Sequence, residues 1–373
     1  MDALMLPLNW QKVRLGDVGK PCMCKRVMKH QTTRYGEVPF YKIGTFGNTA
    51  DAFISKKLFL EYKTKYSFPK KGDILISASG TIGRAVIYDG KPAYFQDSNI
   101  VWIDNDEILV KNDFLFYAYS NVKWNTEHTT ILRLYNDNFR NTLIPLPPLN
   151  EQNAIANILS DVDHYLYSLD ALILKKESVK KALSFELLSQ RKRLKGFNQA
   201  WQRVRLGDIA NYLTSNLSVE QITQQGKIKV YDVNNFIGYT DTTFISDKPY
   251  ISIVKDGSVG RVRILPPKTN ILSTMGALIA NHRTTTEFLF YLLSNFDFKN
   301  FTSGSIIPHI YFKDYKEKTI FLPPLNEQIA IANILSALDN EITSLKNKKR
   351  QFNNIKKALN HDLMSAKIRV LKK

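Results

Sequence analysis

The chain has 373 residues, a length typical of two domains rather than one. Apolar residues make up 44% and aromatic residues 12%, which allows sizeable cores and excludes an intrinsically disordered chain. The net charge of +18 indicates a polyanionic partner, whereas the short, interrupted apolar runs exclude a membrane-spanning helix and the N-terminus lacks the pattern of a secretion signal.

Residues 1–146 are predicted to form a mixed, strand-rich domain. A turn followed by an apolar strand is expected at 71–77, a second strand at 84–88 and a short helix at 114–121.

Two features of this domain are candidates for DNA contact. In the glycine loop Gly80–Arg84, backbone N–H groups, a hydroxyl and a guanidinium could hold a phosphate. A tight turn would explain the glycines equally well, although not the arginine. A basic stretch with Tyr35 lies upstream, and its Arg and Gln side chains are of the types that read guanine and adenine edges, although each alone is also typical of a solvated surface. The candidates are Lys25, Arg26, Lys29, Gln31, Arg34, Thr81 and Arg84.

Residues 147–196 are predicted to form a long helix. Two prolines end the preceding segment, Asn150 is the expected N-cap, and Glu151 lies in the first turn, where the helix dipole favours an anion. Apolar residues then recur at alternating spacings of four and three, which is typical of a coiled-coil seam. The predicted seam residues of this helix are Ile155, Leu159, Val162, Leu166, Leu169 and Ile173.

The second half of the chain repeats the first in the same order. The segment 10–17 returns at 201–208, offset by 191, Gly80–Arg84 returns at 257–261, offset by 177, and the helix start returns offset by 176. The offset falls mainly between residues 55 and 80, so the second copy carries a deletion there. The predicted domains are the strand-rich domain 1–146, the helix 147–196, a second strand-rich domain 197–322 and a second helix 323–373.

The second copy supplies equivalent candidate residues. Its candidate DNA contacts are Lys255, Ser258, Arg261, Arg263 and Arg283, and its predicted seam residues are Ile331, Leu335, Leu338, Ile342, Leu345 and Phe352.

Because each copy has one long helix, the simplest arrangement pairs the two helices within the chain. The sequence therefore predicts an α+β protein in which two mixed α/β domains, related by pseudo-twofold symmetry, are separated by two long helices that form an antiparallel intramolecular coiled coil. The seam from 155 to 187 would span about 50 Å. Most of the positive charge lies at the helix ends, 175–195 and 346–373, although such runs are also typical of solvated helix ends.

Catalytic and metal-binding motifs are absent from the sequence. It has no P-loop, no His-Glu-x-x-His and no Gly-x-Ser-x-Gly. Asp51 with Glu61 and Lys63 imitates a nuclease cluster, but this pattern is common by chance and is missing from the second copy. Cys22 and Cys24 have no His or Cys partner nearby, so we expect reduced thiols in a cytoplasmic protein. The sequence predicts a non-catalytic binding protein without a metal site.

These features together resemble the specificity (S) subunits of type I restriction–modification systems. The resemblance rests on the Pro-Pro-Leu-Asn-Glu-Gln helix starts within 144–163 and 320–339 and on the Trp-to-Asp segments at 10–17 and 201–208. It implies two target recognition domains, each reading one half of a bipartite, asymmetric double-stranded DNA target. It also implies that the helices fix the half-site spacing and dock methyltransferase (M) subunits.

The resemblance also implies partners and cofactors. S-adenosylmethionine, ATP and Mg²⁺ are expected in the M and restriction (R) subunits, and no cofactor is expected in this chain. Repeated helix residues off the seam are candidates for M-subunit contact: Gln152, Ala156, Asn157, Gln328, Ala332 and Asn333. The alternative is a non-catalytic coiled-coil scaffold with protein-binding globular ends. The sequence does not identify the bases that are read.

Overall fold

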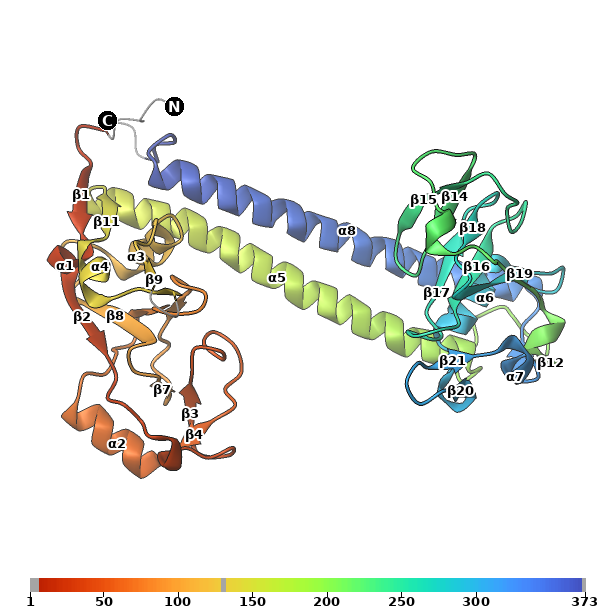
Figure 1. Cartoon of the computed structure of the whole chain (residues 1–373), viewed down its shortest axis with the longest axis horizontal. Coiled ribbons are helices and arrows are strands. Elements are labelled where there is room, and N and C mark those ends of the chain that lie inside the picture. The colour runs from red at the N-terminus through yellow and green to blue at the C-terminus, as the bar shows by residue number, and fades with distance from the viewer. Residues whose placement is uncertain (1–6, 129–131, 371–373) are drawn as a thin grey trace. The chain divides into compact units, whose positions relative to one another are not determined.

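The computed structural model describes residues 7–128 and 132–370, and the chain divides into two compact units (Figure 1). Unit 1 comprises residues 1–169 and 348–373, and unit 2 comprises residues 170–347. Each unit therefore contains a sheet-rich domain and segments of both long helices.

Unit 1 is built mainly from short strands. Its strands are β1 Gln11–Arg14, β2 Gly19–Met23, β3 Val38–Tyr41, β4 Phe53–Ile54, β5 Ile74–Ser77, β6 Ala85–Ile87, β7 Tyr94–Phe95, β8 Ile100–Asn105, β9 Glu127–His128, β10 Leu132–Arg133 and β11 Leu143–Leu146. Its helices are α1 Leu15–Val18, α2 Lys56–Lys65, α3 Asn112–Tyr119, α4 Asn136–Asn141 and the first part of α5 Leu149–Leu188, with a 3-10 turn at Lys29–Gln31.

The strands of unit 1 form two principal sheets. One has the order β2-β8-β5-β6 with every pair antiparallel, and the other has the order β4-β3-β7 with β3 and β7 parallel. Two further pairs, β1 with β11 and β9 with β10, are antiparallel. The strands expected at 71–77 and 84–88 correspond to β5 and β6, and the helix expected at 114–121 corresponds to α3.

Unit 2 repeats this arrangement. Its strands are β12 Gln202–Arg205, β13 Ala210–Thr214, β14 Ile228–Tyr231, β15 Phe236–Thr240, β16 Tyr250–Val254, β17 Val262–Leu265, β18 Asn270–Ile271, β19 Met275–Ala280, β20 Thr302–Ser303, β21 His309–Ile310 and β22 Thr319–Leu322. Its helices are α6 Thr286–Ser294, α7 Phe312–Tyr315 and the first part of α8 Leu325–Met364, with 3-10 turns at Leu206–Asp208, Val219–Gln221 and Lys299–Phe301.

The strand orders of the two units correspond one to one. Unit 2 has the sheets β13-β19-β16-β17 and β15-β14-β18, together with the pairs β12 with β22 and β20 with β21. The segment between β15 and β16 is short and carries no helix, whereas unit 1 has α2 between β4 and β5. This is where the sequence repeat loses residues, so the deletion removes α2 and leaves the sheets intact.

Within each unit, a segment of α5 and a segment of α8 lie side by side and run in opposite directions (Figure 1). In unit 1, the Tyr165 and Phe352 rings are 4.6 Å apart, and Lys356 pairs with Asp163. In unit 2, Lys176 pairs with Glu341, at 2.8 Å between Nζ and Oε1. Lys180 pairs with Asp339 in unit 2 as well, so in each unit a later residue of α5 contacts an earlier residue of α8. The two helix segments are therefore antiparallel.

The predicted seam residues are all buried or half-buried. Ile155 and Leu159 belong to the core cluster of the sheet domain, together with Leu363 and Met364 near the end of α8. Leu187 of α5 likewise belongs to the core cluster of unit 2. The helix seam and the globular core are therefore continuous in each unit, which the heptad pattern did not predict.

Asn150 does not cap α5 as expected. The helix begins at Leu149, which precedes Asn150, so Asn150 lies inside the first turn. The N–H groups of Glu151 and Gln152 donate to the carbonyl of Pro148. The Asn150 side chain still accepts a hydrogen bond from the Glu151 N–H, at 2.9 Å. Proline has no N–H to lose, so it can precede the first turn at no cost in hydrogen bonding.

Candidate nucleic-acid interface

The two glycine loops connect equivalent antiparallel strands, β5 with β6 and β16 with β17. Gly80, Gly83, Gly257 and Gly260 all have positive φ, from 65° to 84°, in the left-handed region that favours glycine. A Cβ on Gly83 would lie 2.1 Å from the Trp124 ring nitrogen, so this position also requires a close approach. Turn geometry therefore explains the glycines.

The repeated arginines of these loops are exposed, and turn geometry does not require them. Arg84 donates from a guanidinium nitrogen to the carbonyl of Phe46 at 2.9 Å, which fixes its position on the neighbouring loop. Thr81, Ser258 and Arg261 are also exposed. An exposed hydroxyl and an exposed guanidinium on a rigid turn can both bind a phosphate oxygen.

The basic stretch of unit 1 contributes to a polar pocket of about 500 Å³. Arg26 and Lys29 line this pocket, and Arg26 pairs with Asp97 at 2.8 Å. Two further cations, Lys42 and Arg133, line it as well. Asp97 and Asp51 pair with two of these four cations, so the lining keeps an excess of positive charge that suits a polyanion.

Sequence reasoning missed part of this pocket. Lys42, Arg133 and the neighbouring pair Gln96 and Asn99 lie on three separate segments, and only the pairing of strands far apart in the chain brings them together. No sequence signal marked Asn99 or Arg133, because neither residue type is repeated at the corresponding position of the second copy.

The other unit 1 candidates are placed less favourably. The Lys25 ammonium lies 5.1 Å from the centre of the Tyr66 ring, and Arg34 is exposed. The Gln31 side chain accepts from the Met28 N–H at 2.8 Å and donates to the Tyr62 hydroxyl at 3.3 Å. Gln31 is therefore engaged within the domain, and the prediction that it contacts a base has no support in this geometry.

In unit 2, three of the candidate side chains make contacts within the domain. Lys255 lies 3.4 Å from Asp256, beside the glycine loop. Arg263 donates to the Asn234 carbonyl at 2.9 Å and stacks over Tyr231, with 5.2 Å between the guanidinium carbon and the ring centre. Arg283 is half-buried as well, and its guanidinium donates to the Gln202 side chain at 3.2 Å.

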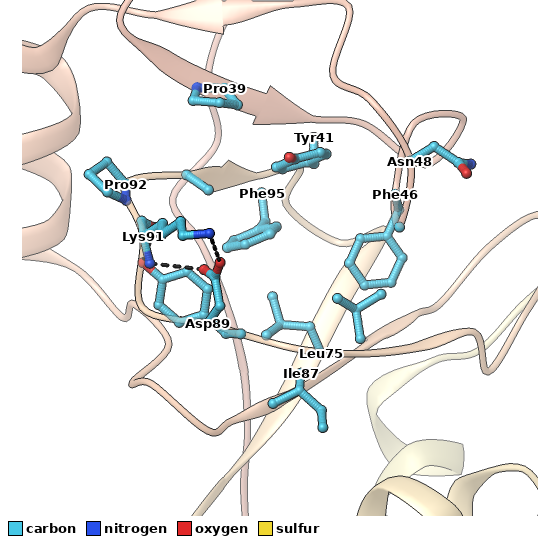
Figure 2. Close-up of a pocket in the computed structure, with 14 residues that line it drawn as sticks. Pro39, Tyr41, Phe46, Asn48, Leu75, Ile87, Asp89, Lys91, Pro92 and Phe95 are labelled. Atoms are coloured by element: carbon cyan, nitrogen blue, oxygen red, sulfur yellow. Dashed lines mark hydrogen bonds and ion pairs between the residues drawn. The ribbon is translucent and has the colours of Figure 1, made fainter. Parts of the chain in front are cut away.

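A second pocket of unit 1, of about 440 Å³, is lined mainly by apolar and aromatic side chains (Figure 2). The Tyr41 and Phe95 rings stack with centres 5.9 Å apart, and Phe46 and Leu75 face them. The Asp89–Lys91 ion pair lies at the rim. This lining suits an apolar group and does not suit a phosphate, so the pocket lies outside the candidate interface.

The buried glutamate at each helix start is held by a socket from its own unit. Glu151 accepts from the Trp10 indole N–H at 3.0 Å and from Arg369 at 2.7 and 3.0 Å. In unit 2, Glu327 accepts from Trp201 at 3.0 Å and from Arg193 at 2.6 and 3.2 Å. The repeated tryptophan and glutamate of the sequence therefore meet in the fold, and each arginine comes from the end of the other long helix.

The glutamine that follows each glutamate is also buried. Gln152 accepts from the Lys111 N–H at 2.8 Å and donates to the carbonyls of Leu109 and Pro147, and it has no exposed surface. Gln328 makes the equivalent bonds in unit 2 and is likewise fully buried.

These contacts correct the predicted M-subunit site. The buried members are unavailable to a partner in this structure, because their side chains hold the helix start against the domain: Gln152, Gln328, Ala156 and Ala332. Asn157 and Asn333 are exposed, and they are the two members that a partner subunit could reach.

A second repeated cluster joins each domain to the helices. The Tyr117 hydroxyl donates to Asp163 at 2.8 Å, and Lys356 completes the cluster in unit 1. In unit 2 the same cluster consists of Tyr291, Asp339 and Lys180. Burial, followed by the hydrogen bond to the aspartate, raises the pKa of Tyr117 and of Tyr291, so both hydroxyls remain protonated donors. The ion pairs with Asp163 and Asp339 thus explain why Lys356 and Lys180 are half-buried in the helices.

Within residues 7–128 and 132–370, no group of three or more His, Cys, Asp or Glu side chains is placed to bind a metal ion. In the same ranges, no helix combines the length and apolar character needed to cross a bilayer. Asp51 and Glu61, the acidic residues of the nuclease-like pattern, pair with Lys42 and Lys65.

Comparisons with known proteins agree with the duplicated architecture. The family model for the type I restriction modification DNA specificity domain matches residues 7–176 and 198–354. The MjaVIII type I restriction enzyme specificity subunit of Methanocaldococcus jannaschii is 26% identical over 414 aligned residues, covering 99% of this chain and 95% of that protein. A type I specificity subunit of Haemophilus influenzae is 63% identical over 148 residues, which cover 39% of this chain and 38% of that protein.

A solved structure shares the fold. The S subunit of a type I restriction–modification system from M. genitalium aligns with a TM-score of 0.63 and 21% identity, covering 96% of this chain and 98% of that chain. Since two copies of the specificity domain account for most of its length, the chain belongs to the family of DNA specificity subunits of type I restriction–modification systems.

Proposed function

We propose that this chain is the non-catalytic, sequence-reading subunit of a type I restriction–modification complex. Each unit would read one half of a bipartite, asymmetric DNA target in double-stranded DNA. The observation that carries this proposal is the repeated glycine loop, which presents an exposed arginine at the same topological position of both units. An arginine on a rigid turn suits the DNA backbone, which both half-sites share, while the residues around it differ and suit different bases.

The long helices would serve the assembly of the complex. The 40 residues of α5 and of α8 correspond to about 60 Å of helix each, enough to set the spacing between half-sites. M subunits would dock on the helix starts through Asn157 and Asn333, which are exposed beside the buried sockets. S-adenosylmethionine would then belong to the M subunits, and ATP and Mg²⁺ to the R subunits, in the cytoplasm.

The proposal is tested by co-expressing the chain with its M subunit and sequencing the methylated DNA of the host. We expect methylated adenines within one split motif that has two unlike halves. M subunit expressed alone is the control and should leave this motif unmethylated. If methylation is the same with and without this chain, the proposed function is wrong.

The scaffold alternative makes a different prediction. A scaffold with protein-binding ends would not bind DNA in a salt-dependent way, whereas a reader of duplex DNA loses affinity steeply as salt rises. The match to the specificity-domain family over both halves favours the DNA reader.

A further inference from the structure

Beside each glycine loop, three segments meet through the same backbone hydrogen bonds. In unit 1, the Ala78 N–H donates to the Asn99 carbonyl at 2.8 Å, and the Leu134 N–H donates to the Ala78 carbonyl at 2.9 Å. In unit 2, Lys255 donates to Thr274 at 3.1 Å, and Ile310 donates to Lys255 at 2.9 Å. The backbone of this junction is therefore repeated.

The side chains at the junction are not repeated. In unit 1 they are Ser79, Asn99 and Arg133, and in unit 2 the corresponding residues are Asp256, Thr274 and His309. We call each set a junction triplet. Each triplet has one residue directly before the glycine loop, one directly before a central strand, β8 or β19, and one on a short hairpin strand, β10 or β21.

The unit 1 triplet presents a guanidinium held by hydrogen bonds. Asn99 Oδ1 accepts from the Ser79 hydroxyl at 2.8 Å and from an Arg133 guanidinium nitrogen at 2.8 Å. Asn99 and Arg133 also line the polar pocket of about 500 Å³, beside Arg26 and Lys29. The guanidinium is thus oriented by a neighbour and faces a surface charged to receive DNA.

The unit 2 triplet presents different chemistry at the same place. His309 Nδ1 lies 2.7 Å from Asp256 Oδ1, and the His309 ring stacks with the Tyr311 ring at 6.4 Å between centres. An imidazole held by a carboxylate lacks the planar fork of donors with which arginine binds guanine O6 and N7.

Residues that stabilise the fold keep their side-chain types in both units, unlike the junction triplets. The Trp–Glu–Arg sockets and the Tyr–Asp–Lys clusters keep the same residue types in both units. The glycine-loop arginines, Arg84 and Arg261, are also kept. Ser79 is buried, and the other members of the junction triplets are half-buried or exposed. The triplets thus combine a repeated backbone, accessible polar side chains and exchanged side-chain chemistry, which is what a base-reading position beside a phosphate anchor requires.

We propose that the junction triplets determine base preference, and that Arg133 reads a guanine in the half-site bound by unit 1. This inference rests on the proposed function and assigns specificity to named residues. Asn99 is the positioning residue for Arg133. The unit 2 triplet, lacking the guanidinium, selects a different base at the corresponding place.

The test is selection from a random duplex DNA library by the chain in complex with its M subunit. Arg133→Gln should reduce discrimination for one guanine in one half-site by roughly 5- to 150-fold, and it should leave the other half-site unchanged. Arg133→Lys should weaken the same preference although it keeps the charge, because lysine lacks the rigid planar fork of arginine. Arg14→Gln, an exposed arginine on β1 of the same unit, is the matched control and should select the wild-type motif.

A transplant gives the converse result. Replacing the unit 2 triplet with that of unit 1, by Asp256→Ser, Thr274→Asn and His309→Arg together, should introduce a guanine into the other half-site.

The selection also separates failure of the inference from failure of the proposed function. If the wild-type complex selects no bipartite motif, the proposed function itself is wrong.

Two further results would overturn the inference and leave the function standing. One is a wild-type motif selected unchanged by Arg133→Gln and Arg133→Lys. The other is unchanged base preference in Arg133→Lys together with a general loss of binding in Arg133→Gln, which would assign Arg133 to a phosphate.

Discussion

At the scale of single residues, the helix-start motif is explained by burial. Glu151 and Gln152 are repeated in the sequence because each satisfies buried donors and acceptors of the domain that precedes the helix. A buried carboxylate is tolerated when it is paired and hydrogen-bonded, and Glu151, at 3% side-chain exposure, has both kinds of partner. The motif is therefore a joint between domain and helix.

This joint predicts a large effect for Arg369→Ala. The substitution leaves the Glu151 carboxylate buried without its cation, which should destabilise unit 1 by about 3–5 kcal/mol. Thermal unfolding and hydrogen exchange at the start of α5 would measure the loss. Lys91→Ala removes a cation from an exposed pair with Asp89 and should cost less than about 1 kcal/mol. Equal effects of the two substitutions would contradict the socket.

The two cysteines should differ in reactivity. Burial raises the pKa of the Cys24 thiol to about 12, so at pH 8 this thiol is protonated and unreactive. Cys22 is partly exposed. A thiol-exchange reagent at pH 8 should therefore modify one thiol in the native protein and two after denaturation. In Cys22→Ser the native protein should show no rapid reaction, and rapid labelling of Cys24 there would contradict its burial.

At the scale of elements, heptad spacing located both long helices but did not identify all of their packing partners. Ile155 and Leu159 fit the seam by spacing, yet they also belong to the globular core of unit 1. Spacing in sequence defines one face of a helix and carries no information on which distant strands cover it. The pairing of Lys356 with Asp163 was not predictable for the same reason, since the two residues are 193 positions apart.

Leu166 tests the helix packing away from the sheet domains. This residue is 7% exposed and its neighbour Tyr167 is 77% exposed. Leu166→Ala should lower the free energy of unfolding of unit 1 by about 2–4 kcal/mol, through lost burial and the cavity left behind. Tyr167→Ala should change it by less than about 0.5 kcal/mol. Hydrogen exchange of α5 amides would measure both, and similar exchange in the two variants would show that the seam is wrongly assigned.

At the scale of the whole molecule, the duplication was predictable, whereas the interface was predictable only in part. Ordered repeats with drifting offsets gave two copies, and the deletion between residues 55 and 80 corresponds to α2. The glycine-loop arginines were found because they are repeated. Arg133 and Asn99 were missed because they differ between copies and meet only through an isolated bridge between segments that are far apart in sequence.

The reciprocal contacts of the helix ends predict that half of the chain can assemble with itself. Arg369 and Lys356 complete unit 1, and the residues 176 positions earlier are Arg193 and Lys180, which make the same contacts in unit 2. In a chain of residues 1–196, the helix end of one copy can therefore complete the domain of another. We expect a homodimer in analytical ultracentrifugation and, under the proposed function, a motif with two identical halves.

Charge reversal makes this prediction specific. Arg193→Glu in the half chain would place a carboxylate against Glu151 of the second copy, so the dimer should dissociate. Combining it with Glu151→Arg restores opposite charges at the same place and should restore the dimer. A half chain that is folded and monomeric would show that residues 170–196 cannot replace 348–373. A single reversal that leaves the dimer intact would show that the copies associate through another surface.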